Sequence, residues 1–113
     1  MNVEVNEVKI SVTVPKENVE EIRNSVCNMG AGLIGNYTFC SIMTKVIGTF
    51  KPNFDADPYI GENNKLEEVE EVKLEVICPI KKAKKIVGKI EKIHPYEEPV
   101  IEVIPLISRK SLG

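Results

Sequence analysis

The sequence has little of what several classes of protein require. It holds one histidine and three cysteines in 113 residues, and its formal net charge is −2. The cysteines, at positions 27, 40 and 78, are odd in number and too far apart for a Cys-x-x-Cys pair, which indicates reduced thiols and no disulfide framework. Without an excess of positive charge, the composition does not indicate a nucleic-acid-binding protein.

Long apolar runs are also missing. No stretch approaches the roughly 18 apolar residues that a membrane helix needs, and residues 1–6 lack the basic and apolar regions of a secretory signal. We therefore expect a soluble, cytoplasmic protein without a membrane partner. The length predicts a single domain over residues 1–113, with residues 1–6 and 107–113 as flexible ends.

A strand and a helix follow one another twice in the sequence, with an offset of 64 residues. Residues 7–14 alternate between apolar and polar, as a half-buried strand does. Pro15 ends this strand, and apolar residues then recur at helical spacing until Gly30 and Gly32 stop the pattern. Residues 71–78, Pro79 and the residues after it restate the same pattern, which predicts a second strand and helix.

Two further strands complete the predicted order. Residues 37–46 are rich in aromatic and β-branched residues and predict a strand, with a shorter extended piece at 49–51, and residues 100–106 predict the last strand. The order βαββαβ is that of the ferredoxin-like open-faced sandwich, an α+β fold with both helices on one face of an antiparallel sheet. Right-handed crossovers place the two strands that precede helices at its centre. The uncovered face and the sheet edges predict self-association.

Residues 47–64 are predicted to form a long loop between the two halves. Loops of this length in a compact domain are usually functional or disordered. Phe50, Phe54 and Tyr59 make it too apolar for a disordered segment, so we expect it to pack on another surface, such as a neighbouring subunit.

The segment 94–99 is the densest in chemically active side chains. It holds the histidine, Tyr96, Glu97 and Glu98, between two prolines that restrict the backbone. His94 is either an acid–base or ligand-contact group or a cap of the preceding helix, where the dipole favours an imidazolium; we favour the cap. In an extended chain Glu97 and Glu98 point to opposite faces, which disfavours a two-carboxylate hydrolase.

Three other groups of residues have an ordinary explanation that we favour. The lysines of residues 81–92 lie where a solvated helix face requires charge, although a phosphate-bearing partner also fits them. Residues 30–35 have the glycines of a phosphate-binding loop but follow a helix instead of opening one. A metal site is conceivable but has no supporting ligand spacing; its residues would be Cys40, Asp55, Asp57 and His94.

Six motifs, in order over residues 8–106, resemble the insert domain of YqfO-type proteins of the Nif-type dinuclear-metal family. Some members of this family are labelled as GTP cyclohydrolase homologues. The motifs are Gly-Leu-Ile-Gly-Asn-Tyr at 32–37, Cys-Ser at 40–41, Gly-Thr-Phe-x-Pro at 48–52, Ala-x-Pro-Tyr-Ile-Gly at 56–61, Glu-Glu-Val-x-Leu-Glu at 70–75 and His-Pro-Tyr-Glu-Glu-Pro at 94–99.

The resemblance implies that this chain is similar to the insert standing alone. In that family the insert is similar in fold to CutA and the PII signalling proteins, which implies a homotrimer with clefts between subunits. The ligands of the family's dinuclear metal centre lie in the flanking halves. The resemblance therefore implies neither that centre nor any other cofactor for this chain.

From these observations we expect a non-catalytic PII/CutA-like module that binds a small anionic ligand or a partner protein at inter-subunit clefts. The alternative is a small divalent-cation-binding, CutA-like protein or an acid–base enzyme that uses His94, Tyr96 and Glu71, with Cys40 and His94 as weak metal candidates. The residues expected at the ligand site or interface are Tyr37, Cys40, Thr49, Phe50, Pro58, Tyr59, Glu71, His94, Tyr96, Glu97 and Glu98.

Overall fold

The computed structural model describes residues 2–113, and over that range it has the predicted βαββαβ order. Short 3-10 turns at Lys16–Asn18 and Arg109–Leu112 precede the first helix and follow the last strand. The main elements are β1 (Glu7–Pro15), α1 (Val19–Asn28), β2 (Ile42–Phe50), β3 (Glu67–Pro79), α2 (Ile80–Ile93) and β4 (Ile101–Leu106).

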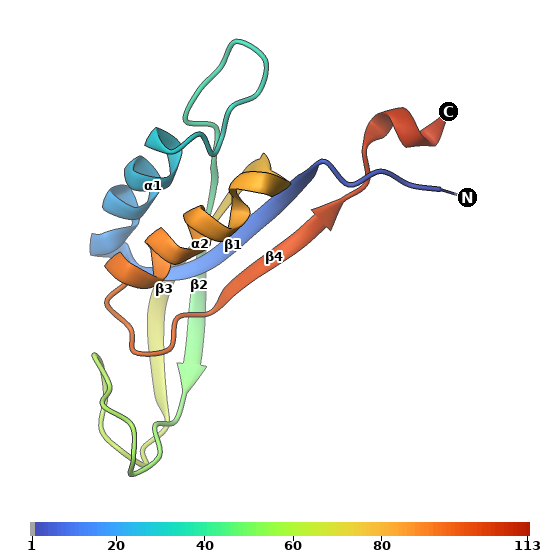
Figure 1. Ribbon diagram of the computed structural model, residues 1–113. Coiled ribbons are helices and arrows are strands. Elements are labelled where there is room, and N and C mark those ends of the chain that lie inside the picture. The colour runs from blue at the N-terminus through green and yellow to red at the C-terminus, as the bar shows by residue number, and fades with distance from the viewer. Residues whose placement is uncertain (1) are drawn as a thin grey trace.

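The sheet has the order β2-β3-β1-β4 with antiparallel neighbours, and both helices cover one of its faces (Figure 1). The two strands that precede helices, β1 and β3, are central. The ferredoxin-like fold is therefore confirmed.

The strands of the two copies of the sequence repeat, β1 and β3, pair with each other and contribute to the core. In the register of β1 and β3, Val8 lies opposite Cys78 and Val12 opposite Leu74, and all four side chains are buried. Because successive strand residues point to opposite faces, one set of alternate residues from each strand lies under the helices. The buried helix residues above them are Val19, Ile22, Val26, Cys27, Ile86 and Ile90.

The second strand differs from its predicted bounds. It begins at Ile42 and not at residue 37, and it continues without interruption to Phe50. The continuation exists because β3 begins as early as Glu67, so that Ile47 pairs with Glu70 and Phe50 with Glu67. The loop between the halves is consequently residues 51–66, shorter than the predicted 47–64.

The two ends of the described chain lie together (Figure 1). Ser108 donates its backbone N–H to the carbonyl oxygen of Glu4 at 2.9 Å, and the N–H of Glu4 reaches the Ser111 hydroxyl at 3.0 Å. That residues 1–6 and 107–113 are flexible stays a prediction. Within residues 2–113, neither helix is both long enough and apolar enough to span a bilayer.

Candidate functional site

The site begins where strand β4 stops short of the end of β1. The pairing of the two strands runs from Glu7 opposite Leu106 to Val12 opposite Ile101. Beyond that point the segment 94–100, which connects α2 to β4, lies beside β1. One ring nitrogen of His94, Nε2, is 2.8 Å from the carbonyl oxygen of Thr13.

His94 holds this segment in place as a neutral imidazole. The backbone N–H of Tyr96 donates to Nδ1 at 3.0 Å, so the ring proton belongs on Nε2, which donates it to Thr13. Burial lowers the pKa of His94, against smaller raising effects from the Thr13 bond and Glu71. His94 is 7% exposed. Its backbone N–H donates a hydrogen bond to the carbonyl oxygen of Ile90 at the end of α2. It ends the helix as predicted, but without the imidazolium charge.

Tyr96 joins the segment to the sheet. Its hydroxyl donates a hydrogen bond of 2.8 Å to Oε2 of Glu71 on β3, and its ring lies 4.8 Å from that of His94 between centroids. Burial raises the pKa of Tyr96 well above its ordinary value of 10.0, and the bond to Glu71 raises it further. Tyr96 is therefore a protonated hydrogen-bond donor at neutral pH.

Glu71 is a buried carboxylate on the sheet face that the helices leave open. It precedes Val72, whose side chain points into the core, so Glu71 points the other way. Only 8% of the residue is exposed. Gly48 of β2 leaves the space for it, because a Cβ at position 48 would overlap Oε1 of Glu71.

The 51–66 loop folds back onto the 94–100 segment of the same chain. The rings of Tyr59 and Tyr96 lie 6.1 Å apart between centroids, and the N–H of Asp57 donates to Oε1 of Glu97 at 3.2 Å. Inside the loop, the Asn63 amide donates to the carbonyl oxygens of Asn53 and Ala56 at 2.9 and 3.0 Å. The loop therefore packs as predicted, but on its own chain.

Between the loop, the segment and the open face of the sheet lies a cavity of about 250 Å³. It brings together most of the residues expected at the site. Residues 95–98 form bends and not an extended chain, so the condition under which Glu97 and Glu98 would point to opposite faces is not met, and both line the cavity. The predicted residues in its lining are Thr49, Phe50, Pro58, Tyr59, Glu71, Tyr96, Glu97 and Glu98.

His94 lies behind this lining and supports it through Tyr96. Sequence reasoning missed six lining residues, of which Pro52, Ala56 and Ile60 lie inside motifs that had been singled out. Thr13 carries no local signal, because it enters the cavity only where β4 stops pairing with β1. The missed residues are Thr13, Lys51, Pro52, Ala56, Ile60 and Val100.

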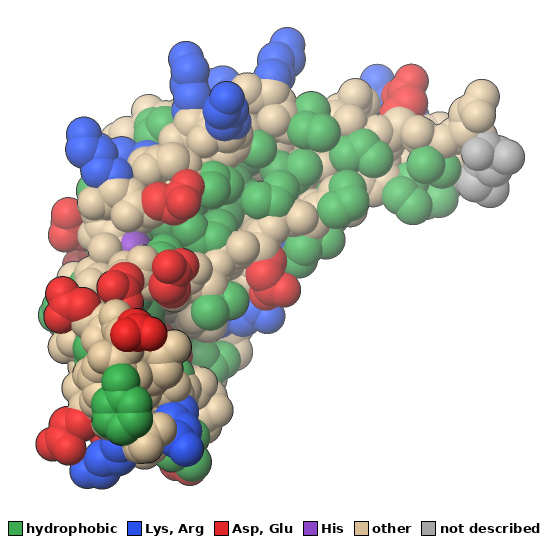
Figure 2. Space-filling model, turned by 60° about the horizontal axis from the view of Figure 1, so that its bottom comes forward, with side chains coloured by type: hydrophobic (Ala, Val, Ile, Leu, Met, Phe, Trp, Pro, Cys, Tyr) green, Lys and Arg blue, Asp and Glu red, His purple; other side chains and the backbone are tan. Residues whose placement is uncertain are grey.

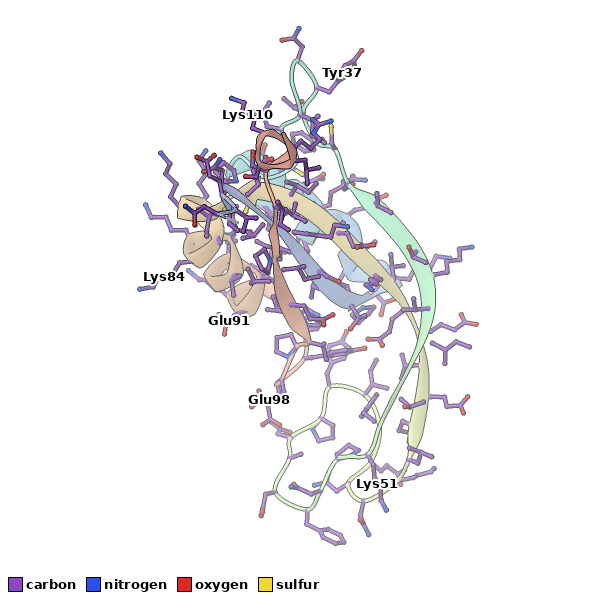
Figure 3. All side chains as sticks on the ribbon, turned by 90° about the vertical axis from the view of Figure 1, so that its right-hand side faces the viewer. Tyr37, Lys51, Lys84, Glu91, Glu98 and Lys110 are labelled. Carbon is purple, nitrogen blue, oxygen red and sulfur yellow. The ribbon has the colours of Figure 1, made fainter. Side chains whose placement is uncertain are left out.

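Tyr37 and Cys40 do not belong to this cavity. Both lie in the loop that follows α1, and Figure 3 shows Tyr37 at the other end of the sheet from Lys51 and Glu98. Tyr37 is 75% exposed, and the N–H of Cys40 bonds the Gly32 carbonyl at 2.9 Å. Within residues 2–113 no three His, Cys, Asp or Glu side chains gather as metal ligands. The weak metal candidates Cys40 and His94 are thus not brought together in one chain.

The cavity lining carries more negative than positive charge. Its ionisable groups are the carboxylates of Glu71, Glu97 and Glu98 and the ammonium of Lys51. Figure 2 shows acidic side chains gathered near the imidazole of His94, with basic side chains along the upper edge and at the lower end of the molecule. This charge does not favour the anionic ligand that the sequence predicted.

Comparisons with known proteins agree with the predicted resemblance. No family model matches the chain. The chain is 42% identical over 106 residues to the GTP cyclohydrolase 1 type 2 homolog of Halalkalibacterium halodurans. The alignment covers 93% of this chain and 28% of that protein. A Bacillus cereus protein related to NIF3 superposes with a TM-score of 0.77 and 36% identity, over 94% of this chain and 27% of that one.

The fold is also that of smaller proteins. The divalent cation tolerance protein Cut A1 of Thermus thermophilus superposes with a TM-score of 0.67 and 19% identity, over 94% of this chain and 91% of that one. At this identity the likeness concerns the fold alone. The chain spans about a quarter of the length of the curated relatives.

Proposed function

We propose that this chain, which is homologous over most of its length to one part of the NIF3/YqfO family proteins, is a non-catalytic ligand-binding module. The observation that carries the proposal is the cavity of about 250 Å³ that the 51–66 loop closes against the 94–100 segment. Loop, segment and sheet meet through specific polar contacts, those of Tyr96 with Glu71 and of Asp57 with Glu97. Binding sites are typically such hollows with a few convergent polar groups.

Binding fits these residues better than catalysis does. A general base needs a free lone pair that reaches the substrate, whereas both ring nitrogens of His94 are engaged within the protein. The raised pKa of Tyr96 opposes formation of a phenolate. Of the proposed acid–base group of His94, Tyr96 and Glu71, it is Glu71 that retains a carboxylate oxygen, Oε1, without a protein donor among residues 2–113.

We further propose that the module works as a homotrimer in the cytoplasm, with the cavity beside an inter-subunit cleft. The edge strands support this, because β2 and β4 carry exposed large apolar side chains, Ile42, Ile47, Val103 and Ile104. Exposed apolar groups on edge strands favour pairing with another copy. A ligand in the cavity would hold the 51–66 loop in one arrangement, and a partner protein would recognise that arrangement.

Native mass spectrometry of protein purified without added ligand tests this proposal. We expect three times the chain mass of 12.6 kDa, with a retained small molecule. Ala56→Trp, which places an indole in the cavity, should remove the retained mass. Leu33→Trp, on the exposed loop after α1, is the matched control and should keep it. A monomer, or a retained mass insensitive to Ala56→Trp, would contradict the proposal.

A further inference from the structure

We infer that the cavity takes a small organic cation, an ammonium or amidinium group on an apolar body, which pairs with the Glu71 carboxylate. This inference rests on the proposed binding function and names its ligand class. The decisive observation is that Glu71, more than nine-tenths buried, faces the cavity with one oxygen that no protein donor within residues 2–113 contacts.

No cationic side chain within residues 2–113 forms an ion pair with Glu71. The ion pair found within 4.0 Å in that range is Lys9 with Glu75, at 3.6 Å, although Lys16 and Lys45 line a neighbouring hollow that Glu71 also borders. A buried carboxylate without a cation loses much of its hydration and recovers little in return. The Tyr96 hydroxyl satisfies Oε2, which leaves Oε1 for a ligand.

The glycine at position 48 accommodates this oxygen. Val46 is the register partner of Glu71 on β2, and Gly48, two residues further along, lies against the carboxylate, so that any side chain there would overlap Oε1. The position of the Glu71 carboxylate therefore depends on a residue without a side chain at position 48.

The walls fit the same class of ligand. Phe50, Tyr59 and Tyr96 give aromatic surface, which attracts cations through the ring quadrupole. Pro52, Ile60 and Val100 give apolar surface for the body of the ligand. Glu97 and Glu98 add negative charge against the one ammonium of Lys51, so an anion meets repulsion at the mouth. A volume of about 250 Å³ lies below the usual range for drug-sized ligands, about 300–1,000 Å³, and suits a small molecule.

Isothermal titration calorimetry with three matched probes tests the inference. Benzamidinium, benzamide and benzoate share a phenyl body and differ in carrying positive, no and negative charge. The titrations contain EDTA, so that no metal ion can mediate binding. We expect benzamidinium to bind about tenfold or more tighter than benzamide, as one charge-assisted bond gives, and benzoate to bind more weakly than either.

Variants assign the preference to Glu71. Glu71→Gln keeps the shape and an acceptor for Tyr96, and should bring benzamidinium to the affinity of benzamide. Glu98→Gln removes an exposed charge at the rim and should change the affinity by less than about threefold, because exposed charges are screened. Tyr96→Phe frees Oε2 and should keep or tighten benzamidinium binding, whereas a purely structural role for the pair predicts that both variants lose it.

The outcomes distinguish the proposed binding function from the inferred ligand class. If no probe binds, or if binding survives Ala56→Trp, the cavity is not a binding site and the proposed function fails with the inference. If benzamide or benzoate binds as tightly as benzamidinium, or Glu71→Gln has no effect, the inference is overturned while the binding module stands. Should Glu71→Gln fail to fold, Tyr96→Phe and the charge series still decide.

Discussion

The loop after α1, residues 29–41, and the loop after β2, residues 51–66, leave opposite ends of the same sheet and are built by different means (Figures 1 and 3). The first is held by backbone hydrogen bonds. The N–H of Gly32 donates to the carbonyl oxygen of Ile77 at 2.8 Å, and the backbones of Ile34 and Tyr37 each donate one hydrogen bond of 2.9 Å to the other. Its large apolar side chains are exposed, Leu33, Ile34, Tyr37 and Phe39.

The second loop also has exposed apolar side chains, Phe54, Tyr59 and Leu66, but it makes polar and aromatic contacts with the rest of the protein. Tyr59 lies on Tyr96, Asp57 bonds Glu97, and Asn63 ties the loop across its width. Beneath it lies the buried carboxylate of Glu71. We infer from this difference that buried polar groups indicate the proposed ligand site better than exposed apolar groups do, because buried polar groups require a partner.

The largest effect should come from substituting one glycine at each end. Gly32 has φ +74°, and a Cβ there would lie 2.5 Å from the carbonyl oxygen of Cys40. Backbone cannot move aside, so Gly32→Ala should reduce the free energy of unfolding by about 3 kcal/mol, from overpacking and left-handed strain together. Gly48→Ala meets only the Glu71 side chain and should cost about 1–2 kcal/mol. Urea unfolding measures both.

The Glu71→Ala background provides the control for this comparison. There the clash with the carboxylate is gone, so Gly48→Ala should cost almost nothing, whereas the cost of Gly32→Ala should be unchanged because the sites are distant. An equal cost of Gly48→Ala in both backgrounds would show that Gly48 does not serve Glu71.

A smaller effect is expected from pH, and it should come from the cavity end. Folding lowers the pKa of His94 below its ordinary value of 6.5. At a pH between the lowered pKa of the folded chain and the ordinary pKa of the unfolded chain, the unfolded chain therefore binds more protons than the folded one. The free energy of unfolding should therefore fall as pH drops through 6.5, by at most about 1.4 kcal/mol per pH unit for one proton.

Denaturant unfolding between about pH 7.5 and pH 5.5, where carboxylates scarcely titrate, measures this dependence. His94→Gln can still donate to the Thr13 carbonyl and does not titrate, so the slope should flatten. His94 is the only histidine of the chain; an unchanged slope in the variant would mean that another group controls it.

The sequence repeat was sufficient to predict the fold, because its period-two and helical patterns fix which residues of both strands and both helices are buried. The motif positions also placed most of the cavity residues. The bounds of β2 were wrong because the early start of β3 at Glu67 has no apolar signal. The entry of Thr13 into the cavity depends on where the pairing of β4 with β1 ends. The direction in which Glu98 points depends on the bends at 95–98. Both are features of tertiary geometry that no local pattern encodes.

The central claim is that the ligand site lies at the cavity end and not at the exposed loop. Backbone amide NMR during a benzamidine titration tests it most directly. The account predicts shift changes at Glu71, Tyr96 and residues 51–66 and none at residues 29–41. Changes centred on Tyr37 and its neighbours, with the cavity residues unperturbed, would contradict it.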